Sequence, residues 1–222
     1  MEKSGLPRTL DGFIVLEGLD GAGTTTQQKL LEKSLSAGGI PHWTCAEPTE
    51  LPSGRLVRQI LRAEVEARPE TLARLFAADR NEHLYGKNGI AERLSRGELV
   101  ICDRYIFSSL VYQGISCGPE LPEALNRGFP LPELLIFFDL PAEVSLGRLD
   151  SRPSREIFET APFQQKAAIL YRETVDSYEA KGLKVLRIDA SKPIEEISAC
   201  IAGAVGDIAA KFRTAAHTDK TA

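Results

Sequence analysis

The strongest indication of the fold of this chain is the stretch Phe13-Ile-Val-Leu-Glu-Gly-Leu-Asp-Gly-Ala-Gly-Thr-Thr25. It opens with a short apolar run typical of a buried strand and continues into a glycine-rich turn. The turn fits the phosphate-binding pattern G-x-x-x-x-G-K-[ST] at every fixed position except the lysine, where Thr24 stands. Because a strand leads in and a helical pattern leads out, backbone N–H groups and a helix N-terminus would face phosphate oxygens. A glycine-rich turn without a nucleotide is the alternative for this stretch taken alone.

Different residues of this loop have different predicted roles. Its glycines permit backbone conformations and close approaches that a side chain would obstruct. Thr25 is the candidate Mg²⁺ ligand through its hydroxyl, with an N-terminal helix cap as the structural alternative. Thr24 offers one neutral donor in place of the lysine ammonium, so another group must neutralise the phosphate charge. The predicted nucleotide-binding residues of the loop are Gly18, Gly21, Ala22, Gly23, Thr24, Thr25 and Thr26.

Strand and helix patterns alternate along the whole chain. Short apolar, β-rich segments predict strands over 13–17, 42–47, 99–103, 134–140 and 184–189. Amphipathic patterns predict helices over 24–36, 56–67, 70–95, 142–149, 162–181 and 193–212. The alternation predicts a three-layer α/β fold, in which helices flank a five-stranded parallel sheet and ligands bind at the carboxyl ends of the strands. Together with the phosphate-binding pattern after the first strand, it resembles the P-loop NTPase fold.

Length and composition favour one globular domain over residues 1–222. The chain has 222 residues, of which 43% are hydrophobic and 26% charged, and no linker divides it. We expect frayed polar tails at 1–10 and 214–222. A net charge of −4 gives no positive field for nucleic acid or an anionic membrane, so neither partner is predicted. No bilayer-length apolar stretch or secretory signal stands out, which predicts a cytoplasmic protein.

Cysteines and histidines are scattered along the chain. Without a C-x-x-C pair or a matching histidine cluster in the sequence, neither a zinc site nor a disulfide framework is predicted, and buried thiols are expected. The histidines receive no assigned chemistry, although pairing in space stays open. These residues are Cys45, Cys102, Cys117, Cys200, His42, His83 and His217.

A second polar site follows the apolar run at 99–103. Asp103-Arg104 ends this predicted strand, and a helix pattern follows. An acid at the end of a buried strand beside a phosphate loop can hold Mg²⁺ through water, and the adjacent arginine can clamp a second phosphate. For an isolated Asp-Arg pair, an ion pair that caps the sheet edge is the alternative.

Several further motifs occur in a fixed order. They are Glu47-Pro48, Gly54 with Arg58 in Pro52–Leu61, Leu75–His83, Asp139–Val144, Arg152–Glu159 and Ile188-Asp-Ala-Ser191. Together with the loop and the Asp-Arg-Tyr segment, they make the chain resemble the thymidylate kinase (dTMP kinase) family of P-loop nucleoside-monophosphate kinases. The resemblance extends from about Phe13 to the final predicted helix.

The resemblance implies a thymine site on two helices. Phe76 would stack on the base and Arg80 would donate to its carbonyl edge; the i, i+4 spacing places both on one helix face. Ser109 is implied to lie against the thymine, and Tyr112 to crowd the sugar 2′ position. Core packing is the alternative for Phe76 and Tyr112, and a solvated or ion-paired position for Arg80.

The resemblance also implies residues around the acceptor phosphate. Asp20 would lie near the sugar 3′-hydroxyl and this phosphate, although an acid in a glycine loop is often a turn former. Arg58 and Arg104 are the implied phosphate clamps, and Glu47 would orient groups of the site. Here Ala46 and Thr49-Glu50 depart from the arginine and the Gly-Gly pair of many relatives.

A basic segment is predicted to act as a small lid over about 147–159. Transition-state cations in this family come from an arginine inside the phosphate loop or from a mobile lid over the nucleotide. This loop has no arginine, so Arg148, Arg152 and Arg155 resemble the lid arrangement and are implied ATP ligands. Arg148 and Arg152 are expected to take over part of the role vacated at Thr24. A solvated basic loop is the alternative.

The resemblance implies transfer of the ATP γ-phosphoryl group to dTMP, which gives dTDP and ADP for dTTP synthesis. It implies ATP and dTMP as partners, Mg²⁺ as cofactor and a homodimer. The implied catalytic residues are Asp20, Arg104, Arg148 and Arg152, and the implied metal residues are Thr25 and Asp103. The alternatives are another nucleoside or nucleotide kinase, and a nucleotide-binding regulatory protein whose catalysis weakened when the lysine was lost.

Overall fold

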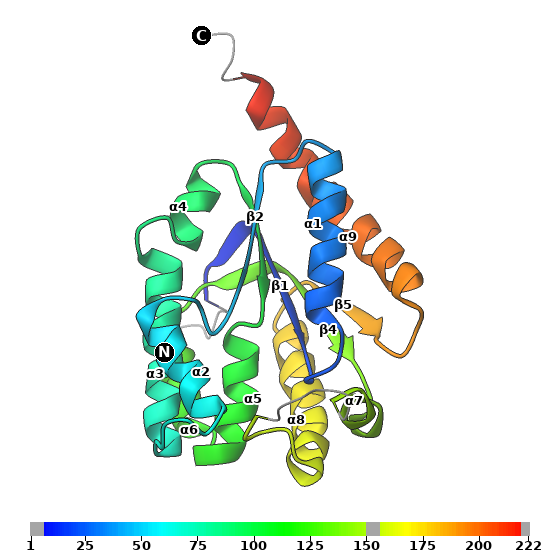
Figure 1. The fold of residues 1–222 in the computed structure, drawn as a ribbon. Helices are drawn as coiled ribbons and strands as arrows, with labels where there is room; N and C mark the ends of the chain where they lie inside the picture. Colours follow the sequence, from blue (N-terminus) through cyan, green and yellow to red (C-terminus); the bar gives the residue numbers. More distant parts are fainter. Residues whose placement is uncertain (1–6, 150–155, 219–222) are drawn as a thin grey trace.

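The computed structural model describes residues 7–149 and 156–218, with side chains described as far as residue 212 (Figure 1). The strands are β1 (Thr9–Gly18), β2 (His42–Ala46), β3 (Leu99–Asp103), β4 (Leu131–Asp139) and β5 (Val185–Asp189). The helices are α1 (Thr24–Ala37), α2 (Pro52–Leu61), α3 (Pro69–Tyr85), α4 (Ile90–Ser95), α5 (Ile106–Cys117), α6 (Glu120–Asn126), α7 (Ala142–Leu149), α8 (Ala161–Ala180) and α9 (Ile194–Thr218).

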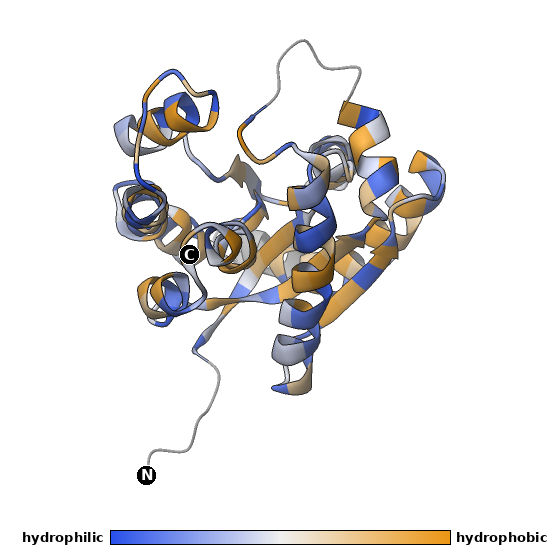
Figure 2. Cartoon of the chain, turned by 90° about the horizontal axis from the view of Figure 1, so that it is seen from below, coloured by the Kyte–Doolittle hydropathy of each residue, from blue (hydrophilic) through white to orange (hydrophobic). Residues whose placement is uncertain are grey.

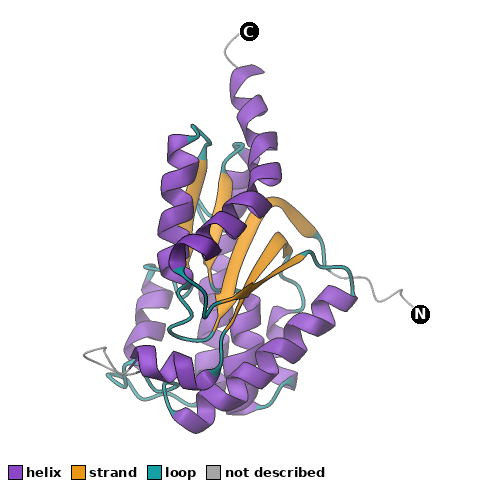
Figure 3. Cartoon of the chain, turned by 90° about the vertical axis from the view of Figure 1, so that its right-hand side faces the viewer, coloured by secondary structure: helices purple, strands orange, loops and turns teal. Residues whose placement is uncertain are grey.

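The sheet confirms the predicted α/β class. Its five strands are parallel and run in the order β2-β3-β1-β4-β5, so β1 lies at the centre. Helices cover both faces of the sheet, which gives three layers (Figure 3). The carboxyl ends of β1, β2 and β3 therefore lie side by side at one edge, which is where a doubly wound sheet binds its ligands.

Alternate residues of β1 build two hydrophobic cores. Phe13 and Val15 pack into the core beneath α3, α5 and α8, whereas Ile14 and Leu16 pack into the core beneath α1 and α9. Because successive side chains of a strand point to opposite faces, a strand covered on both sides is continuously apolar. Figure 2 shows this pattern as hydrophobic strands between helices whose inner sides are hydrophobic.

The predicted helix over 70–95 is wrong in one respect, because two helices occupy this span. Helix α3 ends at Tyr85 and α4 begins at Ile90. In the connection, Asn88 has a φ of 58°, and a Cβ at Gly89 would lie 2.7 Å from the carbonyl oxygen of His83. The chain turns too tightly there for the helix to continue, and the apolar periodicity on either side hides the break.

Other boundaries also differ from the sequence prediction. Helix α2 spans Pro52–Leu61 rather than 56–67, because Pro52 suits a first helical turn and Ala63 has a φ of 57° just beyond the end. Helix α6 was not predicted. Strand β1 begins at Thr9 and helix α9 ends at Thr218, so regular backbone reaches into both segments that were expected to be frayed. Gly182, with a φ of 104°, follows α8 and ends it as predicted.

The described helices include none that could cross a lipid bilayer, since none joins sufficient length to sufficient apolar character. The longest, α9, packs its apolar side against the sheet and α1. Its hydrophobic residues therefore belong to the core of the fold.

Candidate active site

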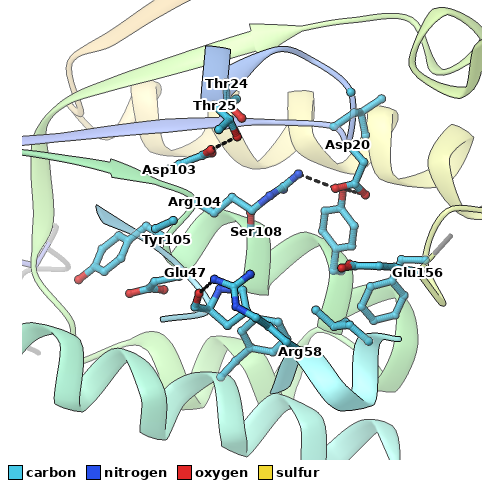
Figure 4. A pocket seen from close by; sticks show the side chains of 18 of the residues that line it. Asp20, Thr24, Thr25, Glu47, Arg58, Asp103, Arg104, Tyr105, Ser108 and Glu156 are labelled. Carbon is cyan, nitrogen blue, oxygen red and sulfur yellow. Dashed lines mark hydrogen bonds and ion pairs between the residues drawn. The ribbon is translucent and has the colours of Figure 1, made fainter. Parts of the chain in front are cut away.

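A cavity of about 480 Å³ opens at the carboxyl edge of the sheet, between the phosphate loop, β3 and helices α2, α3 and α5 (Figure 4). It gathers most residues that the sequence predicted for both nucleotides. The predicted residues that line it are Asp20, Gly21, Gly23, Thr24, Thr25, Thr26, Glu47, Arg58, Phe76, Arg80, Asp103, Arg104 and Tyr112. The sheet order brings these segments together because β2, β3 and β1 are neighbours.

The phosphate loop has the backbone that its glycines require. Gly21 and Gly23 have φ values of 77° and 93°, in the left-handed region that favours glycine. A Cβ at Gly18 would lie 2.8 Å from the carbonyl oxygen of Phe138, so this glycine permits close packing on β4. Ala22 is 3% exposed and points into the core, not into the cavity. The loop therefore has the shape of a phosphate cradle although Thr24 replaces the lysine.

Thr25 and Asp103 form a pair of oxygen donors at the start of α1. The Thr25 hydroxyl donates to Asp103 Oδ2 at 2.6 Å (Figure 4). The other carboxylate oxygen, Oδ1, is buried and has no hydrogen-bond partner among the described residues. Gly23 caps the helix, so the capping alternative for Thr25 is wrong. A buried, unpaired carboxylate oxygen beside a hydroxyl fits Mg²⁺, which prefers hard oxygen ligands and retains several waters.

Asp20, Arg104 and Tyr112 form a hydrogen-bonded triad in the middle of the cavity. Arg104 Nη2 donates to Asp20 Oδ1 at 2.7 Å, and the Tyr112 hydroxyl donates to Asp20 Oδ2 at 2.9 Å. The Arg104 guanidinium carbon lies 5.5 Å from the centre of the Tyr112 ring. Burial raises the pKa of Tyr112 far above its ordinary value, so the phenol keeps its proton and acts as a donor. The triad places a carboxylate and a guanidinium beside the phosphate loop.

Glu17 supports this triad from inside the sheet, a role that the sequence analysis missed. It accepts hydrogen bonds from the backbone N–H of Tyr105 at 2.7 Å and from the hydroxyls of Ser108 at 2.6 Å and Tyr171 at 3.1 Å. The same two hydroxyls accept from Arg104 Nη1. Burial raises the pKa of Glu17 to about 7, although Arg104 and these hydrogen bonds act to lower it. The available signal was a carboxylate inside an otherwise apolar strand.

Arg80 occupies a buried polar niche at the far end of the cavity. Its Nε and Nη2 atoms lie 2.9 and 2.7 Å from Glu47 Oε2, Nη2 also donates to Ser109 Oγ at 3.2 Å, and Nη1 donates to Asn126. The side chain is only 1% exposed, so the solvated alternative is wrong. Ser109 supports Arg80 and does not itself line the cavity. Phe76 is half-buried and its ring contributes to the wall.

The loop after β2 is held by one buried carboxylate. Asp79 accepts from the backbone N–H of Thr49 at 2.7 Å, from the Thr49 hydroxyl at 2.6 Å and from the Ser53 hydroxyl at 2.7 Å. A glycine in place of Thr49 could not supply the hydroxyl, so this departure from the family pattern strengthens the loop. Arg58 donates to the carbonyl of Pro48, and its buried Nε lacks a partner within the described part of the chain.

The cavity is also lined by residues that the sequence analysis did not assign to the site. Gln113 is 2% exposed, and its buried Nε2 is unpaired with respect to the described residues. Its spacing from Ser109 on α5 was the available signal, since i and i+4 share a helix face. Glu156 and Phe158 also line the cavity, and the centre of the Phe158 ring lies 5.4 Å from that of the Tyr112 ring.

The predicted lid is described only in part. Gly147–Leu149 form the end of α7, Glu156 and later residues line the cavity, and Arg152 and Arg155 lie outside the described residues. Arg148 donates to the carbonyl oxygens of Gly21 at 3.1 Å and Ala190 at 3.0 Å. Its guanidinium therefore lies against the phosphate loop, beside the cavity and not within its wall.

A glycine-rich loop between β1 and α1, and an oxygen pair beside it at the end of β3, define a nucleotide-binding protein of the P-loop class. Comparison with known proteins identifies the family within this class. The family model described as thymidylate kinase matches residues 16–201. The chain therefore belongs to the thymidylate kinase family.

Curated relatives agree with this assignment over most of their length. A putative thymidylate kinase of Treponema pallidum is 42% identical over 193 residues, which cover 85% of this chain and 91% of the relative. A putative thymidylate kinase of Aeropyrum pernix is 40% identical and covers 80% of this chain and 85% of the relative. A thymidylate kinase of Leptospira interrogans is 36% identical, with coverage of 83% and 89%.

Proposed function

We propose that this chain transfers the γ-phosphoryl group of ATP to dTMP and releases ADP and dTDP. Its family supports this reaction. The main support for placing the reaction in this cavity is that one cavity is lined by Phe76 and Arg80, by the phosphate loop, and by the ion pair of Asp20 and Arg104. Phe76 and Arg80 suit the base of the acceptor, Asp20 and Arg104 suit its sugar and phosphate, and the phosphate loop suits the phosphates of the donor.

The acceptor base would bind between Phe76 and the polar groups of α3 and α5. An aromatic ring gives a stacking surface for a planar base. Arg80 Nη1 carries a second N–H beyond the one given to Asn126, and this hydrogen can meet a base carbonyl. The unpaired Nε2 of Gln113 supplies a further donor in the same cavity. Tyr112 would close the site beside the sugar.

The acceptor phosphate would bind between Arg58 and Arg104. The buried, unpaired Nε of Arg58 is supporting evidence, because such a donor costs free energy until a ligand satisfies it. Arg104 retains its charge, and the carboxylate of Asp20 orients it. A planar guanidinium can grip a phosphate through two parallel hydrogen bonds, which a lysine cannot.

The donor phosphates would bind to the amides of the loop and the N-terminus of α1. Thr25 and Asp103 would hold Mg²⁺, which when bound neutralises charge on the β- and γ-phosphates. Arg148, which donates to the carbonyl oxygen of Gly21, would supply a guanidinium beside the phosphate loop that lacks the lysine. The residues thereby orient two anions for in-line transfer without a covalent intermediate on the enzyme.

Purified protein tests the proposal directly. We expect ATP-dependent formation of dTDP from dTMP, and slower reaction with dUMP, dCMP, dAMP and dGMP in the same assay. Arg104→Ala should lower the single-turnover rate by on the order of 10³-fold, the effect of one positioned arginine in phosphoryl transfer. A preference for another monophosphate would favour a different nucleotide kinase, and ATP binding without product would favour the regulatory alternative.

The lid arginines make a separate prediction. If they replace the missing ammonium, Arg148→Ala or Arg152→Ala should slow single-turnover transfer by at least about tenfold while dTMP affinity is unchanged, because they would act on the donor phosphates. Arg155→Ala completes the series. Unchanged rates in all three variants would refute this assignment. Thr24→Lys should rescue part of the loss if the loop accommodates the longer side chain.

The assembly and the compartment stay proposals that rest on the resemblance and on composition. We propose a homodimer and a cytoplasmic location. Light scattering on the purified chain should give a mass near 49 kDa, twice the 24.3 kDa of one chain. A mass of one chain would contradict the dimer without affecting the proposed reaction.

A further inference from the structure

Two cysteines and a histidine meet behind the acceptor pocket, although they are far apart in the sequence. Cys45 of β2 and Cys102 of β3 are paired in the register of adjacent strands, and α3 places His83 beside them. Their ligand atoms all lie within 4.8 Å of one another. Cys102 is fully buried, His83 is 5% exposed, and Cys45 on the edge strand is partly exposed. The edge position gives a route from solvent to the cluster.

The orientation of His83 is set by a carboxylate. Its Nδ1 atom lies 3.0 Å from Glu47 Oε1, and the edge of the imidazole packs against Trp43 with 5.6 Å between ring centres. Because Nδ1–H is directed at Glu47, Nε2 is the nitrogen available to the sulfur atoms. A histidine that binds a metal commonly donates its other N–H to a carboxylate in this way.

The charges within the cluster favour a thiolate. Burial alone would raise the pKa of Cys45, but interactions with Cys102 and His83 lower it to about 7. Burial acts to lower the pKa of His83, yet the interactions with the nearby Cys45 and Glu47 raise it to about 10. Metal binding requires deprotonated sulfur and a neutral imidazole, so a cation bound by these atoms would displace the protons that they carry.

We propose that Cys45, His83 and Cys102 bind a thiophilic divalent cation, with Zn²⁺ as the probe. Ligand atoms around tetrahedral zinc stand roughly 3.5–3.8 Å apart, so the observed separation needs only small side-chain rotations. Two thiolates and one imidazole leave the fourth position to water. This soft donor set differs from the hard oxygen pair of Thr25 and Asp103 and discriminates against Mg²⁺.

The competing interpretation is that both cysteines are inert core thiols. Cys102 Sγ donates to the carbonyl oxygen of Arg104 at 3.1 Å, and Cys45 Sγ lies 3.7 Å from that of Ile101. These contacts use thiol protons that metal binding would displace. The inert interpretation predicts no stoichiometric uptake of zinc, so the two are separable by experiment.

Zinc titration of the full-length, reduced and chelator-treated chain tests the proposal. The titration uses a chromophoric competitor and excess Mg²⁺ to saturate the oxygen site. We expect one Zn²⁺ per chain. Cys45→Ala and Cys102→Ala should weaken binding by more than the roughly 10- to 100-fold that loss of an outer-shell partner costs. Cys117→Ala and Cys200→Ala are the matched controls and should bind as the unmodified chain does.

Two further measurements identify the ligands. His83→Asn keeps a donor near Glu47 and removes Nε2, so it should lose zinc affinity while its melting temperature without metal stays close to that of the unmodified chain. Co²⁺ in place of Zn²⁺ should give a thiolate charge-transfer band that is much weaker in both cysteine variants, because each variant has lost one of the two thiolates. Absence of uptake by the unmodified chain, or equal uptake by Cys45→Ala, would overturn the site. None of these readouts depends on kinase activity.

Discussion

At the scale of single residues, Glu17 is a carboxylate that folding moves from water into the sheet. Burial raises its pKa from 4.5 to about 7. The folded chain therefore binds a proton here between these pH values, whereas the unfolded chain has released it. Stability from this group is fully present below pH 4.5 and is lost as pH rises through about 7.

Glu17→Gln should remove this pH dependence. We expect the free energy of unfolding of the unmodified chain, relative to the variant, to fall by about 3 kcal/mol between pH 4.5 and 7. Urea unfolding at a series of pH values measures the difference. Glu143→Gln, at an exposed position of α7, is the control and should show no comparable trend. A constant difference between Glu17→Gln and the unmodified chain would contradict the buried-acid interpretation.

At the scale of elements, the packing of α2 on the loop after β2 decides where Arg58 lies. A Cβ at Gly54 would come within 2.1 Å of the carbonyl oxygen of Thr49, which is backbone and cannot rotate away. Only glycine allows α2 to approach this loop closely. The helix in turn carries Arg58 to the cavity wall.

Gly54→Ala should therefore push α2 outward. We expect a loss of about 1–3 kcal/mol in the free energy of unfolding from overpacking, and a higher KM for dTMP because Arg58 moves with the helix. Gly203→Ala on α9 is the matched control, because a Cβ there meets nothing within 4 Å. It should stabilise the chain by about 0.5–1 kcal/mol. Equal effects of the two substitutions would show that the contact with Thr49 does not limit the position of α2.

At the scale of the whole molecule, one sheet joins both halves of the cavity. The phosphate loop follows the central strand β1, and the acceptor residues come from β2, β3 and the helices on one face. We expect one cooperative unfolding transition for residues 1–222, because β1, β3 and β4 each contribute side chains to both hydrophobic cores.

Binding of dTMP should stabilise the whole fold. A dTMP concentration of about 100 times Kd should add about 2.7 kcal/mol to the free energy of unfolding.

Asp103→Asn distinguishes the stabilisation by dTMP from the stabilisation by an ATP analogue, when the free energy of unfolding is measured with each ligand in turn. The variant should retain the stabilisation by dTMP and lose the Mg²⁺-dependent part of the stabilisation by a non-hydrolysable ATP analogue, because Asp103 is the proposed metal residue. Chelation of Mg²⁺ from the unmodified chain should reproduce the effect. If the Mg²⁺-dependent stabilisation by the ATP analogue persists in Asp103→Asn, residues other than Asp103 bind the metal.

Much of this architecture was predictable from the sequence because its signals are local. Continuous apolar runs mark strands buried on both faces, and the glycine spacing after Phe13–Leu16 predicts a phosphate loop from the local sequence alone. The order of motifs identified the family, and Asp20, Arg104, Phe76 and Arg80 were assigned to one site before their distances were known. Their proposed roles remain predictions for the experiments above.

The alternation of strands and helices, the loop without its lysine and the residue types of the cavity follow from local sequence, since each depends on neighbours along the chain. Which distant side chains meet follows only from the packing of the elements in three dimensions. The register of β2 against β3 pairs Cys45 with Cys102, and helix α3 places His83 beside them. The central strand buries Glu17, which Ser108 links to Arg104. Such contacts arise from strand order and packing, and no periodicity or motif along the chain records them.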